Sequence, residues 1–136
     1  MVRIFLNSDV KVDFCLRSKV TLVIGNSGVG KTFLGRWLQA MSRYYTICTP
    51  KHYKCVYVNT IEAYRGVRDG TIVFLDEMEQ WKKEEVFEAM NIFWSNFEKD
   101  IYYVVSHRTC TWLDIDGADR VKLVNKGGIY TFGGIK

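Results

Sequence analysis

The stretch VTLVIGNSGVGKTFLGRW, which runs from Val20 to Trp37, guides the interpretation of this 136-residue chain. The apolar residues Val20–Ile24 predict a buried strand, and a glycine-rich turn follows them at once. From Lys31 onward, apolar residues recur at the spacing of a helix. The backbone amides of such a turn can point inward, and the N-terminus of the following helix carries a positive partial charge. We therefore expect this stretch to bind phosphate groups.

The turn GNSGVGKT matches the pattern GxxxxGK[ST] at every defined position. Lys31 is expected to contact the β- and γ-phosphates of a nucleotide, and the Thr32 hydroxyl is expected to bind Mg²⁺. The alternative is a glycine-rich turn that holds no ligand, which is disfavoured because a strand precedes the turn and a helix follows it. The predicted nucleotide-binding residues are Gly25, Asn26, Ser27, Gly28, Val29, Gly30, Lys31 and Thr32.

A second apolar stretch, TIVFLDE, ends in two carboxylates, Asp76 and Glu77. The strand Thr71–Leu75 would bring Asp76 to the carboxyl edge of a parallel sheet, where open α/β sheets bind their ligands. Two carboxylates after a strand are by themselves a weak signal, more typical of a surface turn. A matching phosphate-binding turn upstream makes the signal strong.

The two motifs together resemble the Walker A and Walker B elements of the P-loop NTPases. The element order resembles their additional-strand, catalytic-glutamate division, which includes the AAA+, RecA-like and ABC ATPases. This resemblance implies that Asp76 is the Mg²⁺ partner and that Glu77 polarises the attacking water. It extends over nearly the whole chain as element order, but only over Gly25–Thr32 and Thr71–Glu77 as specific motifs.

The resemblance also assigns roles near the strand Ile101–Val105, which would be the additional strand of that division. The residues after it, Ser106 and His107, stand where such ATPases carry a polar sensor of the γ-phosphate. The alternative is that these two residues only cap the strand. Arg108 or Arg120 would be an arginine finger, acting in cis or in trans, or else a solvated surface residue.

The order of the apolar runs predicts an α/β fold, because strands alternate with helices along the chain. The resemblance to the P-loop NTPases implies a three-layer α/β/α arrangement with a mainly parallel five-stranded sheet in the order 5-1-4-3-2. The runs Val2–Leu6 and Val10–Leu16 predict an opening hairpin, and RVKLVNKGGIYTF predicts a closing one. The length predicts a single compact domain over residues 1–136.

The composition suggests few further partners. The net charge of +4 favours a solvated surface, so nucleic acid is a possible partner that the sequence does not indicate. The apolar runs are too short for a membrane span, and the predicted location is the cytoplasm. The cysteines are expected to be reduced; a zinc site is the disfavoured alternative, with the candidate ligands Cys48, His52, Cys55, His107 and Cys110.

The expected function is that of an ATP-binding protein, a Mg²⁺-dependent ATPase that acts in an oligomer or a larger complex. The NKGG segment lacks the aspartate of the guanine-reading NKxD motif, which favours ATP over GTP. Two alternatives remain open. One is a nucleotide-dependent switch that hardly hydrolyses ATP, and the other is a kinase that acts on a small molecule.

Overall fold

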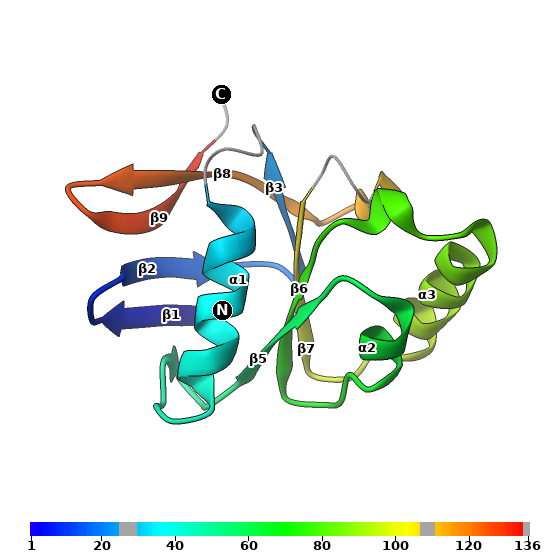
Figure 1. Cartoon of the computed structure of the whole chain (residues 1–136), viewed down its shortest axis with the longest axis horizontal. Helices are drawn as coiled ribbons and strands as arrows, with labels where there is room; N and C mark the ends of the chain where they lie inside the picture. The colour runs from blue at the N-terminus through cyan, green and yellow to red at the C-terminus, as the bar shows by residue number, and fades with distance from the viewer. Residues whose placement is uncertain (25–29, 107–110, 135–136) are drawn as a thin grey trace.

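The computed structural model describes residues 1–24, 30–106 and 111–134. Within these ranges the chain forms one mixed sheet, three α-helices and two short 3₁₀ helices (Figure 1). The elements are, in order, β1 (Val2–Asn7), β2 (Lys11–Leu16), β3 (Val20–Ile24), α1 (Lys31–Ser42), β4 (Cys48–Thr49), β5 (Lys54–Val58), α2 (Ile61–Arg65), β6 (Thr71–Leu75), η2 (Met78–Gln80), α3 (Lys83–Ser95), β7 (Ile101–Ser106), η3 (Thr111–Leu113), β8 (Asp119–Lys126) and β9 (Ile129–Gly134).

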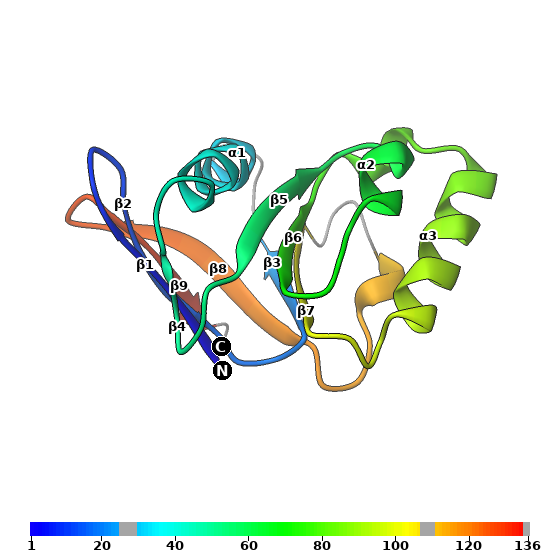
Figure 2. The same cartoon turned by 90° about the horizontal axis from the view of Figure 1, so that it is seen from below.

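The fold class predicted from the sequence is wrong. Instead of a five-stranded parallel sheet in a three-layer sandwich, the described chain contains a nine-stranded mixed sheet in the order β4-β1-β2-β9-β8-β3-β7-β6-β5. The sheet curls around α1 as a half-barrel, as Figure 2 shows from below. The physical reason is that both terminal hairpins join the central sheet. β8 pairs in parallel with β3, and β9 pairs in parallel with β2 through Lys11–Ile129 and Val12–Tyr130.

The strands β8, β3, β7, β6 and β5 all run parallel to one another, and we call them the parallel half. β6 is buried at all five positions, as expected for a strand covered on both faces. On the concave face, α1 packs Leu34 and Leu38 into one hydrophobic cluster. On the other face, α2 and α3 contribute Tyr64 and Phe93 to a second cluster.

The strands β4, β1, β2 and β9 make up the rest of the sheet, which we call the hairpin half. β1 and β2 alternate between buried and more exposed residues, the pattern of strands that bury one face only. Their buried side chains, such as Ile4 and Phe14, belong to the cluster beneath α1. Phe14 of β2 stacks on Phe132 of β9 at a centroid distance of 4.1 Å. This contact adds to the backbone pairing of β2 with β9, which covers two residue pairs.

The outer edge of β5 is covered by side chains of α1. The Ser42 hydroxyl accepts a hydrogen bond from the Cys55 amide at 3.0 Å, and the Gln39 side chain accepts one from the Tyr57 amide at 2.7 Å. These bonds satisfy backbone donors that an edge strand otherwise leaves open to another chain. Among the described residues, no helix is long and apolar enough to cross a membrane.

Candidate functional site

The predicted phosphate-binding turn begins directly after β3 and ends at the start of α1. Its residues Gly25–Val29 lie outside the described part of the chain. Gly30 precedes α1 with a φ of 90°, a left-handed conformation that favours glycine. Its carbonyl accepts the first helical hydrogen bond, from the Leu34 amide at 2.9 Å. The last glycine of the motif therefore turns the chain from the strand into the helix.

A second glycine, Gly35, lets α1 lie close to the sheet. A Cβ atom built at Gly35 would stand 3.0 Å from Cδ1 of Tyr57 and 3.3 Å from Cβ of Phe74. A larger residue would therefore push the first turns of α1 away from β5 and β6. This close approach brings Lys31 and Thr32 to the carboxyl ends of the central strands.

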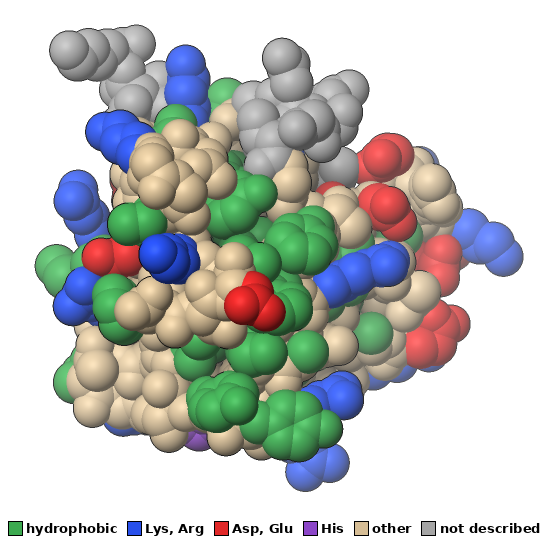
Figure 3. Space-filling view, turned by 60° about the vertical axis from the view of Figure 1, so that its left-hand side comes forward, with side chains coloured by type: hydrophobic (Ala, Val, Ile, Leu, Met, Phe, Trp, Pro, Cys, Tyr) green, Lys and Arg blue, Asp and Glu red, His purple; other side chains and the backbone are tan. Residues whose placement is uncertain are grey.

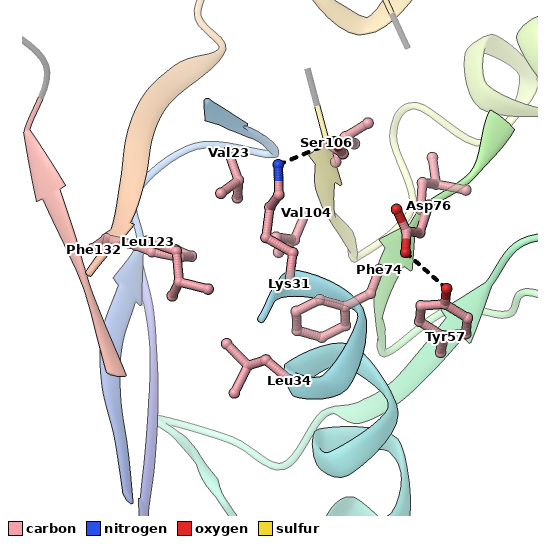
Figure 4. A pocket seen from close by; sticks show the side chains of 12 residues that line it. Val23, Lys31, Leu34, Tyr57, Phe74, Asp76, Val104, Ser106, Leu123 and Phe132 are labelled. Atoms are coloured by element: carbon pink, nitrogen blue, oxygen red, sulfur yellow. Dashed lines mark hydrogen bonds between the residues drawn. The ribbon is translucent and has the colours of Figure 1, made fainter. Parts of the chain in front are cut away.

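Four of the predicted site residues are brought together at these strand ends, and Figure 4 labels Lys31, Asp76 and Ser106 among them. The Lys31 ammonium group donates a hydrogen bond to Oγ of Ser106 at 3.3 Å. The Thr32 hydroxyl donates one to Oδ2 of Asp76 at 2.5 Å. A cavity of about 30 Å³ lies beside them, with Lys31, Asp76 and Ser106 among apolar lining residues. This volume has room for a water molecule next to three polar groups.

The oxygen atoms at this point fit a magnesium ion bound together with a nucleotide. Mg²⁺ prefers oxygen ligands, keeps several waters, and is usually held by one or two carboxylates plus substrate phosphates. The hydroxyl of Thr32 and the carboxylate of Asp76 are within hydrogen-bond distance and would supply two such oxygens. Among the described residues there is no group of three His, Cys, Asp or Glu side chains that would hold a metal alone. Two of the candidate zinc ligands, His107 and Cys110, lie outside the described residues.

Tyr57 joins the site although the sequence analysis did not select it. Its hydroxyl donates a hydrogen bond to Oδ2 of Asp76 at 2.8 Å, the same oxygen that Thr32 contacts. Burial, followed by the hydrogen bond and the negative charge of Asp76, raises the pKa of Tyr57 to about 12. The phenol is therefore neutral at physiological pH and acts as a hydrogen-bond donor.

Glu77 has an unusual backbone conformation. Its φ is 56°, which makes it the one non-glycine residue with a positive φ in the described ranges. Such a conformation costs a residue with a Cβ about 1–2 kcal/mol and is found at functional sites more often than elsewhere. The carboxylate accepts a hydrogen bond from the Asn59 side chain at 3.4 Å, and the Asn59 carbonyl accepts one from the Trp81 indole at 2.8 Å.

Of the three remaining candidates, Arg120 alone lies in the described part of the chain. His107 and Arg108 lie outside the described residues, so the structure gives no position for them. Arg120 is exposed on β8, where it forms an ion pair with Asp114, and it does not line the cavity beside Lys31.

Tyr57 and Asn59 could have been found only through strand pairing. Both residues stand at the end of β5, which runs parallel to β6, with Val58 opposite Leu75. Residues that follow two paired parallel strands lie at the same edge, so Asn59 and Asp76 are neighbours. The sequence shows both strands but not that they are adjacent.

Comparisons with known proteins do not assign a function to the site. No protein-family model, no curated protein and no solved structure matches the chain. The chemistry of the site is therefore inferred from the two motifs and from the contacts described above.

Proposed function

We propose that this chain binds ATP with Mg²⁺ and hydrolyses the β-γ phosphoanhydride, acting in an oligomer or a larger complex. The observation that carries the proposal is the contact between the two motifs. Thr32 at the start of α1 and Asp76 at the end of β6 are hydrogen-bonded, and Lys31 lies beside them. In P-loop NTPases a phosphate-binding turn holds the β- and γ-phosphates, and its Ser or Thr holds Mg²⁺ together with a carboxylate from a neighbouring strand.

Each residue has a distinct task in this proposal. The backbone amides of residues 26–31 and the Lys31 ammonium group would hold the β- and γ-phosphates. Thr32 and Asp76 would hold Mg²⁺, which supplies charge neutralisation on the phosphate oxygens. Glu77 would orient the attacking water, and Ser106 or His107 would contact the γ-phosphate. Catalysis of this kind consists mostly of positioning and electrostatic stabilisation.

The first test is Mg²⁺-dependent ATP hydrolysis by the purified chain at several protein concentrations. Glu77→Gln should retain ATP binding and lose turnover, because the amide cannot accept the proton of the attacking water. Lys31→Ala should lose ATP binding. Glu79→Gln is the matched control, since Glu79 is exposed two residues further on in η2. Turnover by Glu77→Gln at the wild-type rate would exclude the assigned role of Glu77.

One observation favours the switch alternative. The Glu77 carboxylate is engaged by the Asn59 amide in the structure, so the group proposed to orient water already has a partner. A chain that binds ATP tightly, hydrolyses it slowly at every protein concentration and gains no activity from Asn59→Ala would be a nucleotide-dependent switch. A rate per subunit that rises with concentration would instead support an oligomeric ATPase.

The cellular setting forms part of the same proposal. Cys15, Cys48 and Cys55 are free thiols, which fits the reducing cytoplasm. Self-association or a protein partner is proposed because an ATP site needs a process to which hydrolysis is coupled. Cross-linking of the purified chain with and without ATP would detect a nucleotide-dependent assembly.

A further inference from the structure

The convex face of the two terminal hairpins displays side chains that neither motif explains. Residues directly opposite each other on paired strands point to the same face of a sheet, and so do alternate residues along a strand. Pairing places Arg3 opposite Cys15, Asn7 opposite Lys11, Lys11 opposite Ile129 and Ile129 opposite Lys126. The other face of these strands carries the buried cluster beneath α1. We call this surface the basic sheet face; it comprises Arg3, Phe5, Asn7, Lys11, Asp13, Cys15, Arg120, Lys122, Val124, Lys126, Ile129, Thr131 and Gly133, with Arg17 at its end.

The charge of this face is strongly one-sided. It carries six basic side chains and one acidic one, Asp13, whereas the whole chain has a net charge of only +4. The face therefore holds more than the entire positive excess of the protein. All six basic residues are exposed: Arg3, Lys11, Arg17, Arg120, Lys122 and Lys126. In Figure 3, Lys and Arg side chains gather along the left-hand margin.

Few of these charges are neutralised within the protein. Asp13 pairs with Arg3, and Asp114 pairs with Arg120. Within the described ranges, Lys11, Lys122 and Lys126 form no ion pair with an acidic side chain. Lys122 and Lys126 are four residues apart on β8, so their side chains leave the same face about 13 Å apart. Such a row matches the extended negative charge of a polyanion.

The face also offers a stacking surface and a cleft. Phe5 is 48% exposed. The guanidinium group of Arg3 lies over its ring, with Cζ of Arg3 4.8 Å from the ring centroid. A cleft of about 280 Å³ opens between β2 and the β8–β9 hairpin, where the pairing of β2 with β9 has ended. Arg17 and Arg120 both line it, together with the carboxylates of Asp13 and Asp119. Two guanidinium groups in a polar cleft are suited to a phosphate group.

We propose that the basic sheet face binds single-stranded nucleic acid. Proteins that bind single strands without sequence preference combine a positively charged surface along the backbone with aromatic side chains on which bases stack. The lysines of β8 and the arginines of the cleft would contact phosphates, and Phe5 would stack with a base. The face is made mostly of side chains of β1, β2, β8 and β9 and includes none of the predicted nucleotide-binding residues, although Lys122 pairs with Ile24 at the end of β3. This proposal therefore does not depend on ATP hydrolysis.

The chemistry of the face favours a single strand over two other polyanions. An anionic membrane is commonly bound by an amphipathic helix with a large apolar side, and this surface is a sheet with scattered apolar groups. Duplex DNA hides its bases from stacking and presents a groove suited to a helix or a narrow ribbon. An exposed ring beside arginines on an open sheet fits unstacked bases better.

The experiment measures the fluorescence anisotropy of a labelled 20-nucleotide single strand titrated with the full chain, without ATP. Binding should weaken with salt, with a slope of log K against log salt of about −3 for four phosphate contacts. Lys122→Glu with Lys126→Glu should weaken binding about tenfold or more and flatten that slope by about 1.4. The control pair is Lys83→Glu with Lys99→Glu, which removes the same net charge from exposed positions outside this face.

The stacking contribution is tested separately with an aromatic control. Phe5→Ala should weaken binding of the single strand about tenfold without changing the salt slope. Phe87→Ala, at a ring 54% exposed on α3, should leave binding unchanged. Far-ultraviolet circular dichroism and a melting curve establish that each variant is folded before it is compared.

Three results would overturn the proposal. The first is equal loss of binding in the Lys83/Lys99 control, which would indicate attraction by net charge alone. The second is tighter binding of a 20-base-pair duplex than of the single strand. The third is binding to phosphatidylserine-containing vesicles in the absence of any binding to the oligonucleotide.

Discussion

The parallel half and the hairpin half of the sheet differ in how many faces they bury. At β6, in the middle of the parallel half, helices cover both faces and no position is open to solvent, whereas β8, at the border with the hairpin half, exposes Arg120, Lys122 and Lys126. In the hairpin half, α1 covers the concave face alone, and every second residue of β1 is exposed. One continuous sheet therefore contains strands that are buried on both faces and strands that are buried on one face only.

This difference decides where each half can interact with other molecules. Strands buried on both faces present functional groups only at their ends, which is where Asp76 and Ser106 stand beside Lys31. Strands buried on one face present a row of side chains along their whole length. The proposed nucleotide site and the proposed basic sheet face follow from these two arrangements.

The largest expected effect tests whether the parallel half has the more rigid core. Phe93 is fully buried and makes ring contacts with Trp94, Phe97, Tyr103 and Trp112. Phe93→Ala should lower the free energy of unfolding by about 3–5 kcal/mol, measured by urea denaturation. Phe14→Ala, in the hairpin half, should cost less because β2 and β9 share two paired positions and can close on the gap. A greater loss for Phe14→Ala would contradict the comparison.

The next effect concerns the edge of the parallel half. Ser42→Ala leaves the buried Cys55 amide without its side-chain acceptor, which should lower the free energy of unfolding by about 1–3 kcal/mol. The control is Ser95→Ala, an exposed serine at the end of α3, where we expect almost no change. Light scattering of the Ser42 variant should also reveal association, because the edge of β5 becomes available for pairing. A stable monomeric Ser42→Ala protein would show that α1 does not protect this edge.

The two halves were also unequally predictable from the sequence. Continuous apolar runs marked β3 and β6 at their observed bounds, because a strand buried on both faces requires apolar residues throughout. The hairpins were expected too, but only as additions at the edges of the sheet. The alternation of apolar and polar residues in these strands predicts which face is buried. It does not predict that β2 pairs with β9. The fold class was wrong for that reason.

The candidate site shows the same limit. Lys31 and Thr32 belong to a motif with defined spacing, so the sequence shows their proposed roles directly. Tyr57 and Asn59 come from β5, which has no such motif, and their contacts with Asp76 and Glu77 depend on the pairing of β5 with β6. Local patterns identify residues that share a segment, whereas contacts between segments require the topology.

A smaller effect of opposite sign is expected at Glu77, where the parallel half contains backbone strain. Glu77→Gly removes the cost of a left-handed conformation and should raise the free energy of unfolding by about 0.5–1 kcal/mol. The same variant should lose ATP hydrolysis, because the carboxylate is gone. Glu79→Gly, in a residue without positive φ, should be neutral or destabilising. Destabilisation by Glu77→Gly would mean that the contact with Asn59 outweighs the strain.

The smallest effect lies on the exposed face of the hairpin half, at Asp13. Its hydrogen bonds with Arg3, followed by the attraction of the guanidinium charge, lower the pKa of the Asp13 carboxyl below its ordinary value. The folded chain thus favours the ionised form. This contribution is fully present above the ordinary pKa of about 3.9 and is lost as the pH falls through the lowered pKa.

Asp13→Asn should therefore cost about 0.2–1 kcal/mol at pH 7, as expected for an exposed pair, and less near pH 2. Urea denaturation at both pH values measures this difference. Because the substitution also removes the one acidic residue of the basic sheet face, it should tighten binding of the single strand while slightly weakening the fold. Stability and binding that changed in the same direction would indicate that Arg3 depends on Asp13 for its position above Phe5.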